Sequence, residues 1–179
     1  MNILFITHYH ELNGSIRSLL DLAMGLNTYN VSPYFLIPRE GSFSQFLNHN
    51  KLPYKILPIP WWMSEKRYTL SKKAQLAKEI HTTAKTIKDI ARQWQIDLVY
   101  TNTSVIPVGL IAAKIAHLPH IWHIREFGDL DFSLHFLFGK APSLALIKSS
   151  SAVICHSKAV CNYSFKPKTK KIHQIYNGC

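Results

Sequence analysis

The residues best suited to chemistry lie together at the end of an apolar segment, which reads His123-Ile124-Arg125-Glu126. Arg and Glu at the end of a buried strand are costly unless solvated or paired, so ligand binding and a structural ion pair are both open. Arg125 could bind a phosphate or carboxylate with its guanidinium fork. Glu126 could act as a base or accept protons from sugar hydroxyls. His123 shares one side of an extended strand with Arg125, and it could equally be a core histidine.

Small polar residues follow two other apolar segments. Asn102 comes directly after residues 98–101, and Ser157 comes directly after residues 152–156. Their amide and hydroxyl groups could bind sugar hydroxyls or cap the following helix. Because open α/β sheets bind ligands at the carboxyl ends of their strands, both are candidate binding residues.

The beginning of the chain predicts a third part of the same edge. Residues 1–7 are rich in strand formers, residues 8–14 are a polar connection ending in glycine, and residues 15–27 have helical periodicity. A helix start offers free backbone N–H groups and a positive dipole end, which favour an anion. Gly14 and Ser15 are therefore candidates for binding an anion such as a phosphate.

Several familiar motifs are missing or weak. The first strand is followed by no G-x-G-x-x-G, and the chain contains no G-x-x-x-x-G-K-[ST]. Asp129 and Asp131 match the D-x-D of metal-dependent enzymes, but an acidic turn that caps a helix is the better interpretation. His8, His10 and Glu11 are metal ligands by type, although their spacing is no firm signature. The sequence therefore predicts no metal site and no bound cofactor.

The elements that must position these residues alternate along the chain. Strand-like apolar segments are expected at residues 3–7, 31–37, 54–57, 97–101, 120–124, 152–156 and 172–176. Amphipathic helices are expected at residues 15–27, 70–95, 105–117 and 132–149. Residues 58–68 and 166–171 look like linkers. Such alternation is typical of an α/β fold, so we expect one Rossmann-like domain over residues 1–179, with a parallel sheet of about seven strands covered by helices on both faces.

The composition favours a folded domain in the cytoplasm. Of 179 residues, 47% are hydrophobic and 17% are charged. There is no apolar run of roughly 18 residues that would span a membrane, and no basic leader with a cleavage site. Three cysteines show no paired pattern, which is consistent with a reducing compartment.

The net charge of +11 predicts an anionic partner, unless an acidic remainder of a longer protein balances it. Aromatic and basic side chains gather before and at the start of the 70–95 helix, as in proteins that contact the inner face of the cell membrane. A packed helix with a solvated basic face is the simpler alternative. The candidate membrane-contact residues are Trp61, Trp62, Lys66, Arg67, Lys72 and Lys73.

Several segments together resemble the N-terminal, acceptor-side domain of a family-4 (group 1) retaining glycosyltransferase with the GT-B fold. The first is N-G-S-I-R-S-L-L-D-L-A-M-G-L at residues 13–26, in which Gly14 and Arg17 match the family pattern and Asn13 replaces its first glycine. The others are the proline-to-glycine turn at 38–41, the I-D-L-V-Y-T-N strand at 96–102, residues 150–160 and I-Y-N-G at 175–178. Many members carry a histidine six residues after a proline. Counted from Pro119, Arg125 holds that position.

The resemblance implies what such a domain does. It would bind a lipid-linked glycan acceptor for cell-surface polysaccharide biosynthesis, with Arg125, Glu126 and His123 in the catalytic cleft. A C-terminal domain or partner subunit would hold the nucleotide-sugar donor, so this chain alone should be inactive. Members of this fold need no metal for the transfer. Arg17 joins the candidate binding residues on this basis.

A different class of function also fits the charge. The chain could be a non-catalytic basic α/β module that binds a membrane surface or a nucleic acid, and K-P-K-T-K-K at residues 166–171 would support it. No nucleic-acid motif is recognisable, and the aromatic residues form no stacking platform. We therefore expect no nucleic-acid partner.

Overall fold

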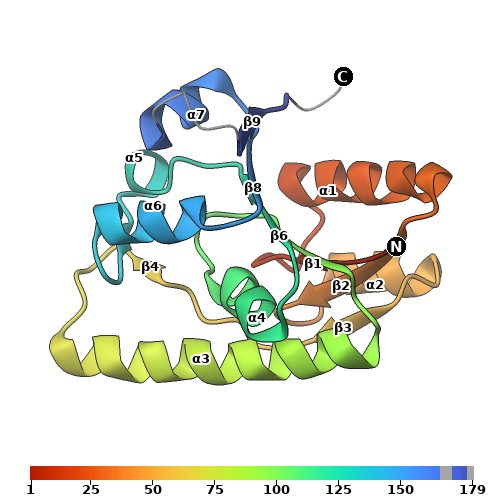
Figure 1. The fold of residues 1–179 in the computed structure, drawn as a ribbon, viewed down its shortest axis with the longest axis horizontal. Coiled ribbons are helices and arrows are strands. Elements are labelled where there is room, and N and C mark those ends of the chain that lie inside the picture. The colour runs from red at the N-terminus through yellow and green to blue at the C-terminus, as the bar shows by residue number, and fades with distance from the viewer. Residues whose placement is uncertain (166–170, 177–179) are drawn as a thin grey trace.

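A seven-stranded parallel β-sheet forms the centre of the molecule in the computed structural model, which describes residues 1–165 and 171–176 (Figure 1). Across the sheet the strands are β3 (Tyr54–Ile56), β2 (Ser32–Ile37), β1 (Asn2–Ile6), β5 (Leu98–Thr101), β6 (His120–Ile124), β8 (Ala152–Cys155) and β9 (Ile172–Gln174). Neighbouring strands pair in parallel throughout. All seven expected strands are present, which confirms the α/β, Rossmann-like fold class.

Helices cover both faces of this sheet (Figure 1). They are α1 (Gly14–Gly25), the short 3-10 helix η1 (Leu26–Tyr29), α2 (Ser42–His49), α3 (Leu70–Gln93), α4 (Val108–Ala116), α5 (Asp129–Phe132), α6 (Lys140–Lys148) and α7 (Lys158–Ser164). Side chains of β1 alternate between two hydrophobic clusters because successive strand residues face opposite sides. Phe5 packs with Ile16 of α1 and Phe43 of α2, whereas Ile6 packs with the cluster that contains Ile87 of α3.

The largest difference from the expected elements concerns residues 132–149, where a single helix was predicted. The structure has instead the end of α5, the strand β7 (His135–Phe136) and α6. Ser133 and Gly139 have φ of 51° and 88°, so the backbone turns before α6 begins. β7 pairs antiparallel with β4 (Met63–Ser64), which lies in the stretch expected to be a linker. Helix α2 was not among the expected helices.

Trp62 is buried, so its prediction as a membrane-contact residue is wrong. Its side chain is 2% exposed, its Nε1 donates to the Ser104 carbonyl at 2.7 Å, and its ring stacks on Trp122. Trp61, its neighbour, is 40% exposed. The two rings lie in different surroundings because the β4–β7 ribbon holds this segment against the sheet.

Buried hydrogen bonds under α4 join β5, β6 and the turn that precedes β8. His120 Nε2 lies 2.8 Å from Thr101 Oγ1, and His120 Nδ1 lies 3.0 Å from Ser150 Oγ. Burial lowers the pKa of His120 to about 3, so the ring is neutral near pH 7. Gly109 of α4 permits this close packing, since a Cβ there would lie 2.0 Å from Thr101 Oγ1.

In the part of the chain that the structure describes, no helix is both long and apolar enough to span a bilayer. Most of the lysine run at 166–171, and Asn177 and Gly178 of the I-Y-N-G motif, lie outside the described residues.

Candidate functional site

Several of the candidate catalytic and binding residues lie at the carboxyl edge of the sheet, beside the point where the strand order reverses. From β1 the chain moves outward to β2 and β3, and then returns to place β5 on the other side of β1. Ligands of open α/β sheets bind at such a switch point, because the adjacent loops diverge there and leave a crevice. The loops after β1, β5 and β6 supply the side chains described below.

Arg125 connects the loop after β6 to both sides of the switch point. Its Nε donates to Asn102 Oδ1 at 2.6 Å, and its Nη1 donates to Ser18 Oγ of α1 at 3.2 Å. Asn102 Nδ2 in turn donates to the Ser15 carbonyl at 3.4 Å. Burial lowers the pKa of the Arg125 guanidinium, while Tyr100 and Glu126 act in the opposite direction. A guanidinium stays protonated under such conditions, so the cluster places a fixed positive charge at the edge.

Glu126 is held by the loop after β5. Its Oε1 accepts hydrogen bonds from Thr103 Oγ1 at 2.5 Å, from the Ser104 backbone N–H at 2.5 Å and from Ser104 Oγ at 2.9 Å. Thr103 and Ser104 are 0% and 4% exposed. One carboxylate oxygen therefore fixes two neighbouring loops together, and a catalytic role for Glu126 stays a prediction.

This geometry predicts a large stability loss in Glu126→Ala. The substitution leaves three buried donors without their acceptor, which should lower the free energy of unfolding by about 2–4 kcal/mol. Urea unfolding followed by circular dichroism measures the change. Glu40→Ala is the matched control because Glu40 is an exposed carboxylate in the loop after β2. Equal, small losses in both variants would contradict the holding role.

His123 lies in β6, two residues before Arg125, and is almost completely buried, with 5% of its surface exposed. Its Nδ1 lies 2.6 Å from the Tyr100 hydroxyl oxygen. Burial, followed by the charges of Arg125 and His156, lowers the pKa of His123 to about 3. Burial also raises the pKa of Tyr100, so its hydroxyl keeps a proton that it can donate to Nδ1.

Three buried imidazole nitrogens near this edge have no hydrogen-bond partner among the described residues: His8 Nδ1, His123 Nε2 and His156 Nδ1. Burial lowers the pKa of His8 to about 4, and its ring packs edge-on against Trp61. Within residues 1–165 and 171–176, no group of three or more His, Cys, Asp or Glu side chains is arranged to hold a metal ion.

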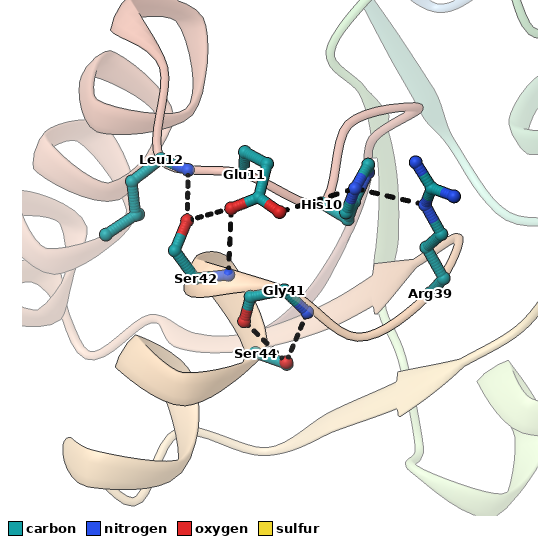
Figure 2. A network of polar contacts seen from close by, with 7 residues as sticks. All are labelled: His10, Glu11, Leu12, Arg39, Gly41, Ser42 and Ser44. Carbon is teal, nitrogen blue, oxygen red and sulfur yellow. Dashed lines mark hydrogen bonds and ion pairs between the residues drawn. The ribbon is translucent and has the colours of Figure 1, made fainter.

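A polar network fastens the loop after β1 to the start of α2 (Figure 2). Glu11 Oε2 accepts from the Ser42 backbone N–H at 3.0 Å and also from the Ser42 hydroxyl. Ser42 Oγ accepts from the Leu12 N–H at 2.8 Å, and Arg39 Nε donates to His10 Nε2 at 3.0 Å. These contacts give His10 and Glu11 a role in loop structure.

Gly41 is required where these two loops approach each other. A Cβ at this residue would lie 2.5 Å from the carbonyl oxygen of His10 and 2.8 Å from Glu11 Oε1. Because one of these contacts is backbone, the loops could not adjust by a side-chain rotation alone.

The start of α1 faces open space at the edge. Asn13 caps the helix by accepting from the Ile16 N–H at 3.0 Å, and a Cβ on Gly14 would meet nothing within 4 Å. Among the described residues, the backbone N–H groups of Gly14 and Ser15 have no acceptor. Arg17, four residues after the same N-cap, is exposed; its binding role stays a prediction.

Two other predictions can be compared with local contacts. Ser157 caps α7 by accepting from the Val160 N–H at 3.2 Å, which confirms its capping role. Asp129 begins α5 and accepts from Lys140 and Tyr163, while Asp131 accepts from the Phe127 N–H. The N-cap of α5 is Gly128, with no side-chain hydrogen bond, so the predicted capping by the D-x-D is not confirmed; Asp129 instead joins α5 to Lys140 and Tyr163.

No protein-family model matches the chain, and neither does any curated protein sequence. Solved structures do match. HepE of Anabaena bound to UDP superposes with a TM-score of 0.68 and 22% identity, over 100% of this chain and 44% of HepE. MurG of Acinetobacter baumannii gives 0.63 and 13%, over 96% of this chain and 44% of MurG. The spinosyn forosaminyltransferase SpnP gives 0.54 and 16%, over 97% of this chain and 50% of SpnP.

The chain has the fold of one half of a GT-B glycosyltransferase. It spans half or less of the length of each of these structures. HepE has also been solved with UDP-glucose and with UDP and glucose.

Sequence reasoning missed two residues of the site: Ser18, which contacts Arg125, and Tyr100, which contacts His123. A signal for Ser18 exists, because it lies one helical turn after Ser15 and so shares its side of α1. Tyr100 reads as an ordinary apolar strand residue, and only its pairing with His123 across two strands gives it a polar role.

Proposed function

We propose that residues 1–179 form the N-terminal, acceptor-side domain of a retaining glycosyltransferase similar to family 4. With a C-terminal domain or a partner subunit, it transfers a hexose from a nucleotide-sugar donor to a lipid-linked glycan acceptor in cell-surface polysaccharide biosynthesis. The observation that carries this proposal is the Arg125–Asn102–Ser18 cluster at the switch point of a sheet that superposes over its whole length on HepE. The UDP-glucose bound to HepE supports a nucleotide-sugar donor.

Each candidate residue has a role in this proposal. Arg125 binds an anionic group of donor or acceptor in the cleft between the two halves, and Asn102 keeps its guanidinium in place. The backbone N–H groups of Gly14 and Ser15 face the donor phosphate or the transferred sugar. His123, neutral at pH 7, lies behind them and orients the polar groups of the cleft. The donor is held mainly by the other half, so this chain contributes no cofactor site and no metal.

The experiment is an add-back assay. Membranes from cells that lack this chain are supplied with a radiolabelled nucleotide sugar, with or without the purified chain. The chain should restore labelling of a solvent-extractable lipid product, and the chain alone should turn over no donor. Absence of any restored label, or robust turnover of the donor by residues 1–179 alone, would contradict the proposal.

We also propose that the protein works at the inner face of the cell membrane. The net charge of +11 favours an anionic surface, and Trp61, Lys66, Arg67 and Lys72 are exposed. Leu70 at the start of α3 is 85% exposed, which adds an apolar group between these cations.

A further inference from the structure

A basic cavity opens where the start of α3 meets the segment between β7 and α6. Its volume is about 380 Å³. Its basic lining residues are Arg67 and Lys73, just before and within the start of α3, and His135 and Lys140 from the β7–α6 segment. Figure 1 shows α3 beginning on the same side of the molecule as β4 and α5. None of the candidate catalytic residues lines this cavity.

The charges in this cavity favour an anion. Asp129 is the acidic residue in its wall, and it already forms an ion pair with Lys140 at 2.9 Å and accepts from the Tyr163 hydroxyl at 2.8 Å. Within the described residues, neither Arg67 nor Lys73 forms an ion pair. Two cations thus face the cavity without a matching carboxylate, a suitable arrangement for a phosphate group.

An apolar cavity of about 220 Å³ adjoins the basic one between α3, α4 and α6. The residues that line it are Trp62, Ala77, Ile80, His81, Pro107, Ile111, Phe138 and Leu146. Phe138 lines both cavities and is 53% exposed. The two cavities are therefore neighbours that share one aromatic wall.

One stripe of α3 leads from the basic cavity to the apolar one. Lys73 lines the first, and Ala77 and Ile80, four and seven residues later, line the second. Residues at these spacings lie on the same face of a helix. The surface thus changes from cationic to apolar along a single line, which matches a molecule with an anionic head and a hydrocarbon tail.

We propose that these two cavities together bind a membrane lipid with a phosphate head group. The phosphate lies between Arg67 and Lys73, and part of the hydrocarbon chain lies against Phe138 and Ala77. Free phosphate would leave the apolar cavity empty, so the paired cavities favour the lipid over the free anion. This inference rests on the proposed membrane contact and gives it a specific ligand and place.

The test is a titration of the full chain with octyl phosphate, inorganic phosphate and 1-octanol by calorimetry. Octyl phosphate should bind at least about tenfold more tightly than either fragment, since the head and tail contribute together. The double variant Arg67→Gln/Lys73→Gln should lose at least about tenfold in affinity. Ala77→Trp, which fills the apolar cavity, should weaken octyl phosphate and leave inorganic phosphate unchanged.

Matched controls separate this site from general electrostatics. Lys78→Gln/Lys85→Gln removes the same charge from exposed positions of α3 and should retain octyl phosphate binding. Ala74→Trp adds the same indole ring at an exposed position of α3 and should also retain octyl phosphate binding. In flotation with phosphatidylcholine vesicles that contain phosphatidic acid, the bound fraction of each variant should follow the order of the octyl phosphate affinities. Vesicles without phosphatidic acid are the comparison. Circular dichroism confirms that each variant folds.

Two outcomes would overturn the lipid site. One is octyl phosphate binding no tighter than inorganic phosphate, and the other is an equal loss in the Lys78/Lys85 control. No donor or transfer step enters these measurements. A failure of the add-back assay therefore leaves the lipid site standing, and failure here leaves the transferase proposal standing.

Discussion

Arg125→Ala should lower sugar transfer about 100-fold or more in the add-back assay, while the domain remains folded. The variant removes a positively charged hydrogen-bonding group that is already fixed in position at the reacting site. The guanidinium is fixed from two sides, by Asn102 Oδ1 and Ser18 Oγ, so it need not reorganise when substrate binds. Arg125→Lys should recover only part of the activity, since an ammonium group keeps the charge and loses the fork.

Two further variants make this result specific. Ser18→Ala removes one hydrogen bond to Arg125 and leaves the charge, so its loss should be much smaller than that of Arg125→Ala. Lys85→Gln removes a charge from the exposed face of α3 and should transfer sugar like the unmodified chain. Wild-type rates in Arg125→Ala, with thermal melts unchanged, would exclude Arg125 from the cleft chemistry.

Acid should destabilise the domain strongly between pH 7 and 5. The pKa values of His120 and His123 are about 3 in the folded protein, against about 6.5 in an unfolded chain. Between pH 6.5 and 3 the unfolded chain binds protons on these two rings that the folded protein does not bind. The contribution of the neutral rings to the free energy of unfolding is therefore fully present above pH 6.5 and is lost as the pH falls toward 3. Each ring should contribute a loss of about 2 kcal/mol between pH 7 and 5, which is large beside the stability of a typical domain.

Urea unfolding at several pH values measures this loss. His123→Gln cannot take up a proton, so the slope of stability against pH between 6 and 4 should fall by about 1.4 kcal/mol per pH unit. His120→Gln should show the same flattening, even if it lowers stability at pH 7 by disturbing the contacts with Thr101 and Ser150. The exposed His49→Gln should keep the original slope. Unchanged slopes in both buried-histidine variants would contradict the explanation.

Much of the fold could be predicted because its signals are local. Short apolar runs alternate with amphipathic segments, and this pattern indicates parallel strands with crossover helices. It places Asn102 and Arg125 at strand ends, and parallel strands necessarily bring those ends to one edge. Segment 132–149 was predicted wrongly since its apolar residues have helical spacing, while a positive φ at Gly139 and pairing with β4 decide its structure.

The candidate site depends more on contacts between distant segments. Nothing near Glu126 in the sequence indicates that Thr103 and Ser104 hold one of its oxygens. Likewise, adjacent tryptophans look equivalent as candidates for a membrane surface. Only the packing of Trp62 on Trp122, and its hydrogen bond to the Ser104 carbonyl, separates it from the exposed Trp61.

The sequence by itself thus determined the α/β class, the strand ends that carry polar residues and the excess of positive charge. These follow from periodicity and composition, which each segment carries alone. The tertiary structure decided which polar residues meet, as when Ser18 and Asn102 both contact Arg125, and which cations share a cavity with an apolar neighbour. These contacts between distant residues depend on strand register and on helix packing. A local sequence pattern does not predict them, because it carries no information on which distant segments pack together.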